Sequence, residues 1–273
     1  MAAKVLGKML MQFISHLTVM RGSDDPEAVH QARVAWRRFK TGLRLFKPAQ
    51  YEAESTMPLL TSLQPLLQGL GALRDLDVAV TQTLPQWRRT YIDSGLKTSA
   101  AQARRRRDWR QMSQALQRLA DEYRCLVRCE LGRSPVVATL LALTAWVDGL
   151  TAAWPCDESA SVPLRRWARR RLAHWHACFK AAIKTGRYSA NPERQHRARI
   201  MAKRLRYAVD ALGFLLPAQR SRLWRQRATQ VQTKLGAARD LLQAHALAES
   251  VAADEDILAF LQHAADQVGD QSS

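Results

Sequence analysis

One basic stretch led by a histidine occurs twice in the chain, and this repeat limits the possible folds more than any other feature. The first copy is VHQARVAWRRFKTGLR at residues 29–44, and the second is QHRARIMAKRLRYAVD at residues 195–210. When the copies are aligned, these residues coincide: His30 with His196, Arg33 with Arg199, Val34 with Ile200, Arg37 with Lys203, Arg38 with Arg204, and Lys40 with Arg206. The match predicts a duplicated structural unit, and such repeats must be identified before a fold is assigned.

A second, glycine-containing motif follows each copy at nearly the same distance. It reads LGALRDL at residues 70–76 and LGAARDL at residues 235–241. A glycine inside a helix costs about 1 kcal/mol relative to alanine, so we expect another helix to pack closely against it. Arg74 and Asp75 either pair with each other or hold a neighbouring basic helix in place.

Both copies of the basic stretch have the spacing of an amphipathic helix of about five turns. The apolar residues at helical intervals are Val29, Ala32, Trp36, Phe39, Leu43 and Phe46 in the first copy, and Ala198, Ala202, Leu205, Val209 and Leu212 in the second. Asp-Pro-Glu at 25–27 and Asn-Pro-Glu at 191–193 are helix-start signals, because they combine a capping side chain, a proline and an acidic residue.

A stripe of cationic residues runs beside the apolar stripe of each helix. It consists of His30, Arg33, Arg37, Lys40 and Arg44 in the first copy, within roughly 80° of arc, and of His196, Arg199, Lys203 and Arg206 in the second, before Asp210 interrupts it. Like charges four residues apart destabilise an isolated helix by a few tenths of a kcal/mol each. One such stripe is typical of a solvated face, but two stripes of the same pattern favour an anion-binding site.

The charge balance indicates an anionic partner. The 273 residues include 42 Lys and Arg against 24 Asp and Glu, which gives a net charge of +18, and the pI is near 10.7. Nucleic acid, a phosphate polymer and an acidic membrane are the candidate classes. Arginine outnumbers lysine, which suits bidentate contacts with phosphate oxygens.

The sequence predicts an all-α fold, since glycine and proline are sparse and no alternating β-branched run occurs. The expected helices span residues 2–20, 26–47, 51–68 (which continues or kinks into a helix that reaches about 85), 101–123, 164–185, 192–216, 218–252 and 254–268. A further helix is expected in the weakly charged section 126–150, after Ser134-Pro135. The proline-containing stretch 154–163 is the best boundary between repeats. We therefore predict a single domain of two repeat units, at about 1–153 and 164–273, each of roughly four helices and related by a pseudo-twofold axis. The two basic stripes then either face one another across a cleft or lie on opposite outer surfaces.

Metal binding and membrane insertion are not predicted. Cys125, Cys129, Cys156 and Cys178 form no CxxC pair, and they are interpreted as free thiols in a reducing cytosol. His174 and His176 are two residues apart, which places them on different sides of a helix. No run of 18 apolar residues is present.

The repeated motifs resemble those of the CHAD family, named for its conserved histidine α-helical domain. The resemblance rests on 29–46, on His196 to Ala208 with its KRLRY core, and on both LGxxRD segments, and it extends over practically the whole chain. It implies two four-helix bundles around a basic central cavity and the binding of inorganic polyphosphate. The polyphosphate contacts that it implies are His30, Arg33, Arg37, Arg38, Lys40, Arg44, His196, Arg199, Lys203, Arg204, Arg206 and Tyr207. Members are often fused to a triphosphate-tunnel catalytic domain, whose strand pattern this sequence does not show, and Asp210 weakens the second stripe.

Three classes of function compete at this stage. Polyphosphate binding needs cations but no aromatic platform, and most of the tryptophans lie beside core positions. DNA or RNA binding is the alternative that net charge supports equally well. Catalysis through His30 or His196 is disfavoured, because Asp75 and Asp240 each follow an arginine and look structural. We expect a non-enzymatic, cofactor-free cytoplasmic protein with no catalytic or metal-binding residues, with granule targeting, scaffolding and enzyme regulation all open.

Overall fold

The computed structural model describes residues 2–46, 53–94, 98–152, 161–186 and 192–272. The helices are α1 (Ala2–Gly22), α2 (Pro26–Phe46), α3 (Ala53–Ser62), α4 (Gln64–Val78), α5 (Leu84–Asp93), α6 (Ser99–Gly132), α7 (Ser134–Ala152), α8 (Ser161–Gly186), α9 (Pro192–Leu212), α10 (Ala218–Lys234), α11 (Ala237–Ser250) and α12 (Glu255–Ser272). A π-helical turn, η1 (Ala79–Thr83), joins α4 to α5, and a 3-10 turn, η3 (Gly213–Leu215), follows α9. No strand occurs in these ranges, and the all-α prediction is confirmed.

The two basic repeats form α2 and α9, each of 21 residues. α2 starts as the sequence predicts, since the Glu27 N–H donates to Asp25 Oδ1 at 2.9 Å and satisfies one of the free amides of the first turn. The apolar stripe is buried in both helices: Ala32 and Phe39 are fully buried in α2, as are Ala202 and Leu205 in α9. The corresponding cap of α9, Asn191, lies outside the described residues.

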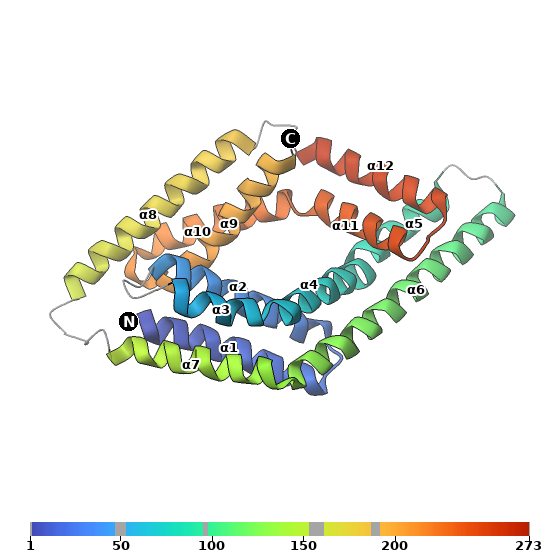
Figure 1. Cartoon of the computed structure of the whole chain (residues 1–273). Coiled ribbons are helices and arrows are strands. Elements are labelled where there is room, and N and C mark those ends of the chain that lie inside the picture. Colours follow the sequence, from blue (N-terminus) through green and yellow to red (C-terminus); the bar gives the residue numbers. More distant parts are fainter. Residues whose placement is uncertain (1, 47–52, 95–97, 153–160, 187–191, 273) are drawn as a thin grey trace.

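Other helices pack against the two basic helices (Figure 1). α1 packs on α2, and α8 and α10 pack on α9. In Figure 1, α1 and α7 lie along the lower edge of the view, α8 and α12 along the upper edge, and α2, α4, α9 and α11 between them. Contacts between α2 and α9 and between α4 and α11 connect the earlier part of the chain to the later part, so the two basic helices lie inside the molecule.

Several predicted boundaries are wrong, because proline and glycine bend the chain where periodicity alone predicted straight helices. The predicted helix 51–68 is divided at Leu63, just before Pro65 enters the first turn of α4. The helix that continues toward residue 85 contains the π turn, in which the Leu84 N–H donates to the Ala79 carbonyl. Pro85 has no N–H with which to continue a regular helix from there.

The other errors concern the end of α6 and the helix predicted at 218–252. α6 continues to Gly132, beyond its predicted end near residue 123, whereas the helix predicted after Ser134-Pro135 is α7, which begins at Ser134. The predicted helix 218–252 is broken at 235–236 into α10 and α11. Of the predicted boundary at 154–163, residues 154–160 lie outside the described residues and 161–163 begin α8. The two-unit division and its pseudo-twofold axis stay predictions.

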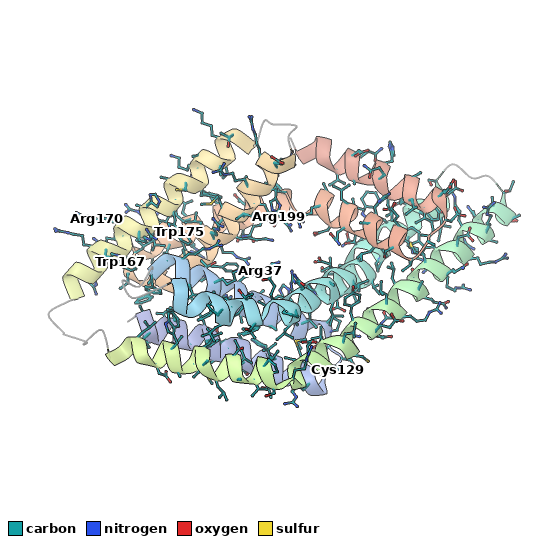
Figure 2. The ribbon with its side chains drawn as sticks, in the orientation of Figure 1. Arg37, Cys129, Trp167, Arg170, Trp175 and Arg199 are labelled. Carbon is teal, nitrogen blue, oxygen red and sulfur yellow. The ribbon has the colours of Figure 1, made fainter. Side chains whose placement is uncertain are left out.

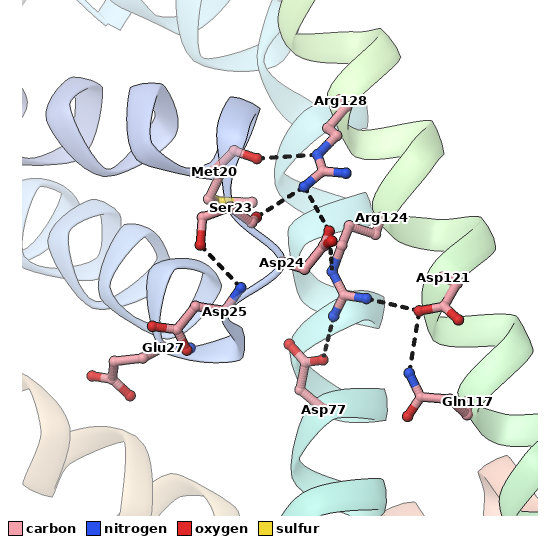
Figure 3. Close-up of polar contacts among 10 residues, drawn as sticks. All are labelled: Met20, Ser23, Asp24, Asp25, Glu27, Asp77, Gln117, Asp121, Arg124 and Arg128. Carbon is pink, nitrogen blue, oxygen red and sulfur yellow. Dashed lines mark hydrogen bonds and ion pairs between the residues drawn. The ribbon is translucent and has the colours of Figure 1, made fainter.

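The long helix α6 is held against α4 and the α1–α2 turn by two arginines (Figure 3). Arg124 contacts the buried carboxylate of Asp77 on α4 at 3.1 Å. Arg128 donates to the carbonyls of Met20 and Ser23, at 3.2 and 2.9 Å, and lies 2.7 Å from the Asp24 carboxylate. These contacts fix the start of α2, and with it the register of the basic stripe.

Candidate anion-binding site

Residues from both basic helices and both glycine motifs line one cavity of about 420 Å³. The charged and histidine residues of its lining are His30, Arg33 and Arg37 from α2, Arg74 and Asp75 from α4, His196, Arg199 and Lys203 from α9, and Arg239 and Asp240 from α11. Figure 2 shows Arg37 and Arg199 on facing sides of the space between their helices. The structure therefore brings together half of the twelve residues that the sequence indicated.

The cavity contains more cationic than anionic side chains, and the cations are partly desolvated. Its six lysine and arginine side chains face two carboxylates, Asp75 and Asp240. Burial lowers the pKa of Arg33 and of Arg199 below the usual value, although Asp75 and Asp240 respectively act in the opposite direction. Buried cations in excess of their counter-charges are costly, and an anion that enters the cavity relieves that cost.

Lys203 shows this effect most strongly. Burial, followed by the neighbouring charges of Arg37, Arg199 and Arg239, lowers its pKa to about 7, although Asp240 acts in the opposite direction. An ammonium group normally titrates near 10.4. The cavity therefore disfavours one of its own positive charges when no anion is bound.

The two histidines are held as neutral rings. Burial, followed by the charge of Arg74, lowers the pKa of His30, and burial followed by the charge of Arg239 lowers that of His196. Arg239 Nη1 lies 2.8 Å from His196 Nδ1. Because a guanidinium can only donate, Nδ1 is the acceptor and Nε2 carries the proton of the neutral ring. His196 thus retains an N–H donor that an anion can use.

The first glycine motif gives Arg33 room to extend, because a Cβ atom on Gly71 would lie 2.7 Å from Arg33 Nη1. At Gly236 an added Cβ would first meet the Gln232 carbonyl oxygen at 2.9 Å, and Arg199 Nη2 would lie 3.8 Å away in ordinary contact. Asp240 of the second motif lies 3.8 Å from Arg199. The close packing predicted at this glycine is thus a contact with the basic helix. Each glycine motif supports the arginine of its own repeat.

Arg74 and Arg239 are site residues that the sequence did not predict. A structural role beside Asp75 or a neighbouring basic helix was expected for Arg74 and no site role for Arg239, whereas both line the cavity. The signal that could have identified them is the repetition of the motif itself: an arginine kept at the same position of both copies parallels the repeated stripe arginines.

The other six predicted contacts lie outside this cavity: Arg38, Lys40, Arg44, Arg204, Arg206 and Tyr207. Arg44 and Arg204 line a second cavity, beside α8. Tyr207 is buried, and the guanidinium carbon of Arg206 lies 5.0 Å from the centroid of its ring. The Nε atom of Arg38 is buried without a hydrogen-bond partner among the described residues.

No group of three or more His, Cys, Asp or Glu side chains in the described part of the chain is arranged to hold a metal ion. None of the described helices is long and apolar enough to cross a membrane.

Comparison with known proteins places the chain in a family. The structure is similar to the crystal structure of the CHAD domain from the plant Ricinus communis, with a TM-score of 0.74 and 23% identity over 96% of this chain and 83% of that chain. It is also similar to PptA from Streptomyces chartreusis, with a TM-score of 0.58 and 18% identity over 99% of this chain and 97% of that one. No curated protein sequence gives a significant match. The CHAD domain family model matches residues 4–249, and the chain therefore belongs to the CHAD domain family.

Proposed function

We propose that the protein binds inorganic polyphosphate in the cavity between α2 and α9. The observation that supports the proposal most directly is the lining of the cavity. Cations from α2 and α4, early in the chain, and from α9 and α11, late in the chain, surround one space. The contacts are Arg33, Arg37, Arg74, Arg199, Lys203 and Arg239, with N–H donors from His30 and His196. Polyphosphate is a linear chain of anionic phosphates, so it supplies the repeated negative charge that such a lining lacks.

The shape and chemistry of the cavity favour polyphosphate over DNA or RNA. The cations lie between packed helices rather than along one exposed helix that could enter a groove of a duplex. The described lining residues include no Trp, Tyr or Phe, whereas proteins that bind single strands usually stack bases on aromatic side chains. Nucleic acid is therefore expected only as a non-specific competitor, bound by the surface charge.

The geometry supports binding rather than catalysis. Asp240 lies within reach of Arg199, and His196 accepts a hydrogen bond from Arg239 through Nδ1. A general base needs a free acceptor and a pKa suited to proton transfer. Both groups are instead used to position the arginines.

A competition titration tests the proposal. Labelled long-chain polyphosphate is bound to the protein and challenged with DNA, RNA or pyrophosphate across a salt series. The test variant Arg37→Glu/Lys203→Glu reverses two charges in the cavity. The control variant Arg106→Glu/Arg110→Glu makes the same change of net charge on α6, where both side chains are exposed.

We expect polyphosphate to remain bound in the presence of excess nucleic acid, and binding to be lost in the cavity variant but kept in the control. Equal losses in the two variants would show that overall charge, not the cavity, is responsible. Nucleic-acid binding as tight as polyphosphate binding would contradict the proposal in favour of a generic basic surface.

A further inference from the structure

A second cavity, of about 620 Å³ and with a different lining from the first, lies between α8, α9 and the end of α2. α9 separates the two cavities, because Arg199 and Lys203 line the first while Arg197 and Arg204 line the second. The wall opposite α9 is formed by α8, which includes Trp175. A cavity of this size is within the range of small-molecule sites.

The position of α8 beside this cavity is fixed by Arg171. Its Nε donates to the Leu45 carbonyl at 3.1 Å, and its Nη2 donates to the Arg44 carbonyl at 3.0 Å. These carbonyls belong to the last turn of α2, where backbone acceptors have no partner within the helix. Trp167 of α8 also stacks on Phe46 at 5.7 Å between ring centroids. These contacts between α8 and the end of α2 fix the positions of two walls of the cavity.

Three further arginines of the cavity have no carboxylate partner. Arg44, Arg197 and Arg204 form no ion pair among the described residues, and no described lining residue is acidic. Burial, followed by the charge of Arg44, lowers the pKa of Arg204. The charges of Arg44 and Arg204, after burial, also lower the pKa of Lys40 nearby. This cluster of cations is suited to bind an anion.

The remaining wall is apolar, in contrast to the first cavity. Trp175, Met201, Ala181 and Ala182 contribute to it. A bare phosphate chain gains little from such a wall, because it has no apolar surface to bury. A ligand that joins a phosphate group to a flat apolar group uses both halves of the cavity.

We propose that the second cavity binds an organic phosphate of the nucleoside triphosphate class. Its phosphates contact Arg44, Arg197 and Arg204, and its base lies against Trp175 and Met201. The proposal goes beyond polyphosphate binding and does not depend on it, since the first cavity has its own cations.

Cys178 provides a direct probe of occupancy. Its thiol lines the cavity and lies 3.7 Å from His174 Nε2, whereas Cys125 is exposed on α6 and serves as the internal reference. The protein is alkylated with N-ethylmaleimide in the presence of ATP or of inorganic tripolyphosphate, and each cysteine peptide is quantified by mass spectrometry. We expect ATP to protect Cys178 but not Cys125, at a concentration about tenfold lower than tripolyphosphate requires, because base contacts add to the phosphate contacts.

Matched variants separate the two cavities. Arg197→Ala removes a cation of the second cavity, and Arg194→Ala removes an exposed arginine of α9 outside it. Ala181→Phe fills the second cavity, and Ala177→Phe places the same ring one turn earlier on α8. We expect protection by ATP to be weakened about tenfold by Arg197→Ala and abolished by Ala181→Phe, and to be unchanged in the two controls.

Protection by ATP should also persist in Arg37→Glu/Lys203→Glu, in which the first cavity is disabled. Protection of Cys178 by ATP in this variant, whether or not the variant still binds polyphosphate, distinguishes this proposal from the proposed polyphosphate binding. Equal potency of ATP and tripolyphosphate would overturn it, because the apolar wall would then contribute nothing and the cavity would be an extension of the first site. Absence of protection at Cys178 by ATP would overturn it as well.

Discussion

Lys203 is the residue at which the requirements of folding and of binding conflict most directly. In the free protein its side chain is partly buried beside Arg37, Arg199 and Arg239, and its pKa falls to about 7. The unfolded chain holds the same group at its ordinary, higher pKa. A bound polyanion raises the pKa of Lys203 again, because it favours the charged form of the side chain.

The first prediction concerns protons taken up on binding. Above pH 7 the free protein holds Lys203 mostly neutral, so polyphosphate that raises its pKa must draw a proton from the buffer. We expect proton uptake at pH 8, and an affinity that falls as the pH rises from 6 to 9. Calorimetry at pH 8 in buffers of different ionisation enthalpy measures the uptake. Lys203→Met should lose that uptake; an equal uptake in the variant would assign the proton to another group.

The second prediction concerns stability without ligand. Below pH 7 Lys203 is charged in both the folded and the unfolded protein, so the full cost of burying the charge destabilises the fold. Between pH 7 and the ordinary pKa the unfolded state binds more protons, so the free energy of unfolding rises with pH and the cost is relieved. At pH 6, Lys203→Met should therefore unfold at higher urea than the wild type, while binding polyphosphate less tightly. A variant less stable than the wild type at pH 6 would show that the charge is not costly.

The third prediction separates binding from stability at Gly71. In Gly71→Ala, the added Cβ would lie 2.7 Å from Arg33 Nη1, so the arginine must move away from its place in the cavity. Alanine also favours the helix by up to about 1 kcal/mol. We expect weaker polyphosphate binding with unchanged or greater stability. Gly149→Ala is the control, because a Cβ at Gly149 meets nothing within 4 Å; it should bind normally.

At the scale of helices, one buried ion pair joins α6 to α4. Arg124 and Asp77 are both almost fully buried, and burial raises the pKa of Asp77 despite the opposing charge of Arg124. Removal of one member of such a pair leaves an uncompensated charge in the interior. Replacement of both members of the pair by apolar groups leaves no unpaired charge in the interior.

The fourth prediction follows from this pair. Arg124→Met should lower the free energy of unfolding by about 3–5 kcal/mol at neutral pH, and the loss should shrink as the pH falls, because Asp77 is then protonated. Arg124→Met/Asp77→Leu should recover most of the stability, and Arg110→Met, an exposed site on the same helix, should change little. Urea unfolding measures all three. If the free energy of unfolding of Arg124→Met lay within about 1 kcal/mol of the wild-type value, the ion pair would be effectively solvated and the prediction contradicted.

Helices with a strong apolar period could be predicted from the sequence, whereas their breaks could not. α2 and α9 follow from apolar spacing and from Pro26 and Pro192. The same dipeptide, Leu-Gly, lies inside α4 at residues 70–71 but between α10 and α11 at residues 235–236. Local sequence therefore does not decide the conformation of the glycine motif. Packing against the rest of the fold decides it.

The candidate site was predictable only in part for a similar reason. The stripe from His30 to Arg44 extends about 21 Å along a helix, which is longer than one cavity. The sequence identifies the stripe, but only the packing of α4 and α11 decides where the cavity ends. His30, Arg33 and Arg37 line the first cavity, while Arg44 lines the second.

At the scale of the whole molecule, the two basic helices contribute to one space. α2 and α9 are separated by more than 140 residues of chain, yet they contact each other and place their cations around the same cavity. A repeat that formed two separate surfaces would bind two ligands independently. A shared cavity makes each half of the chain incomplete without the other.

The stoichiometry of binding tests this central claim most directly. Calorimetry with polyphosphate of one defined short length should give one polymer per protein. Arg37→Glu, in α2, and Arg199→Glu, in α9, should each weaken that single binding event as a whole. Two polymers per protein, with one of them bound at unchanged affinity in either variant, would contradict the shared cavity and assign a separate site to each repeat.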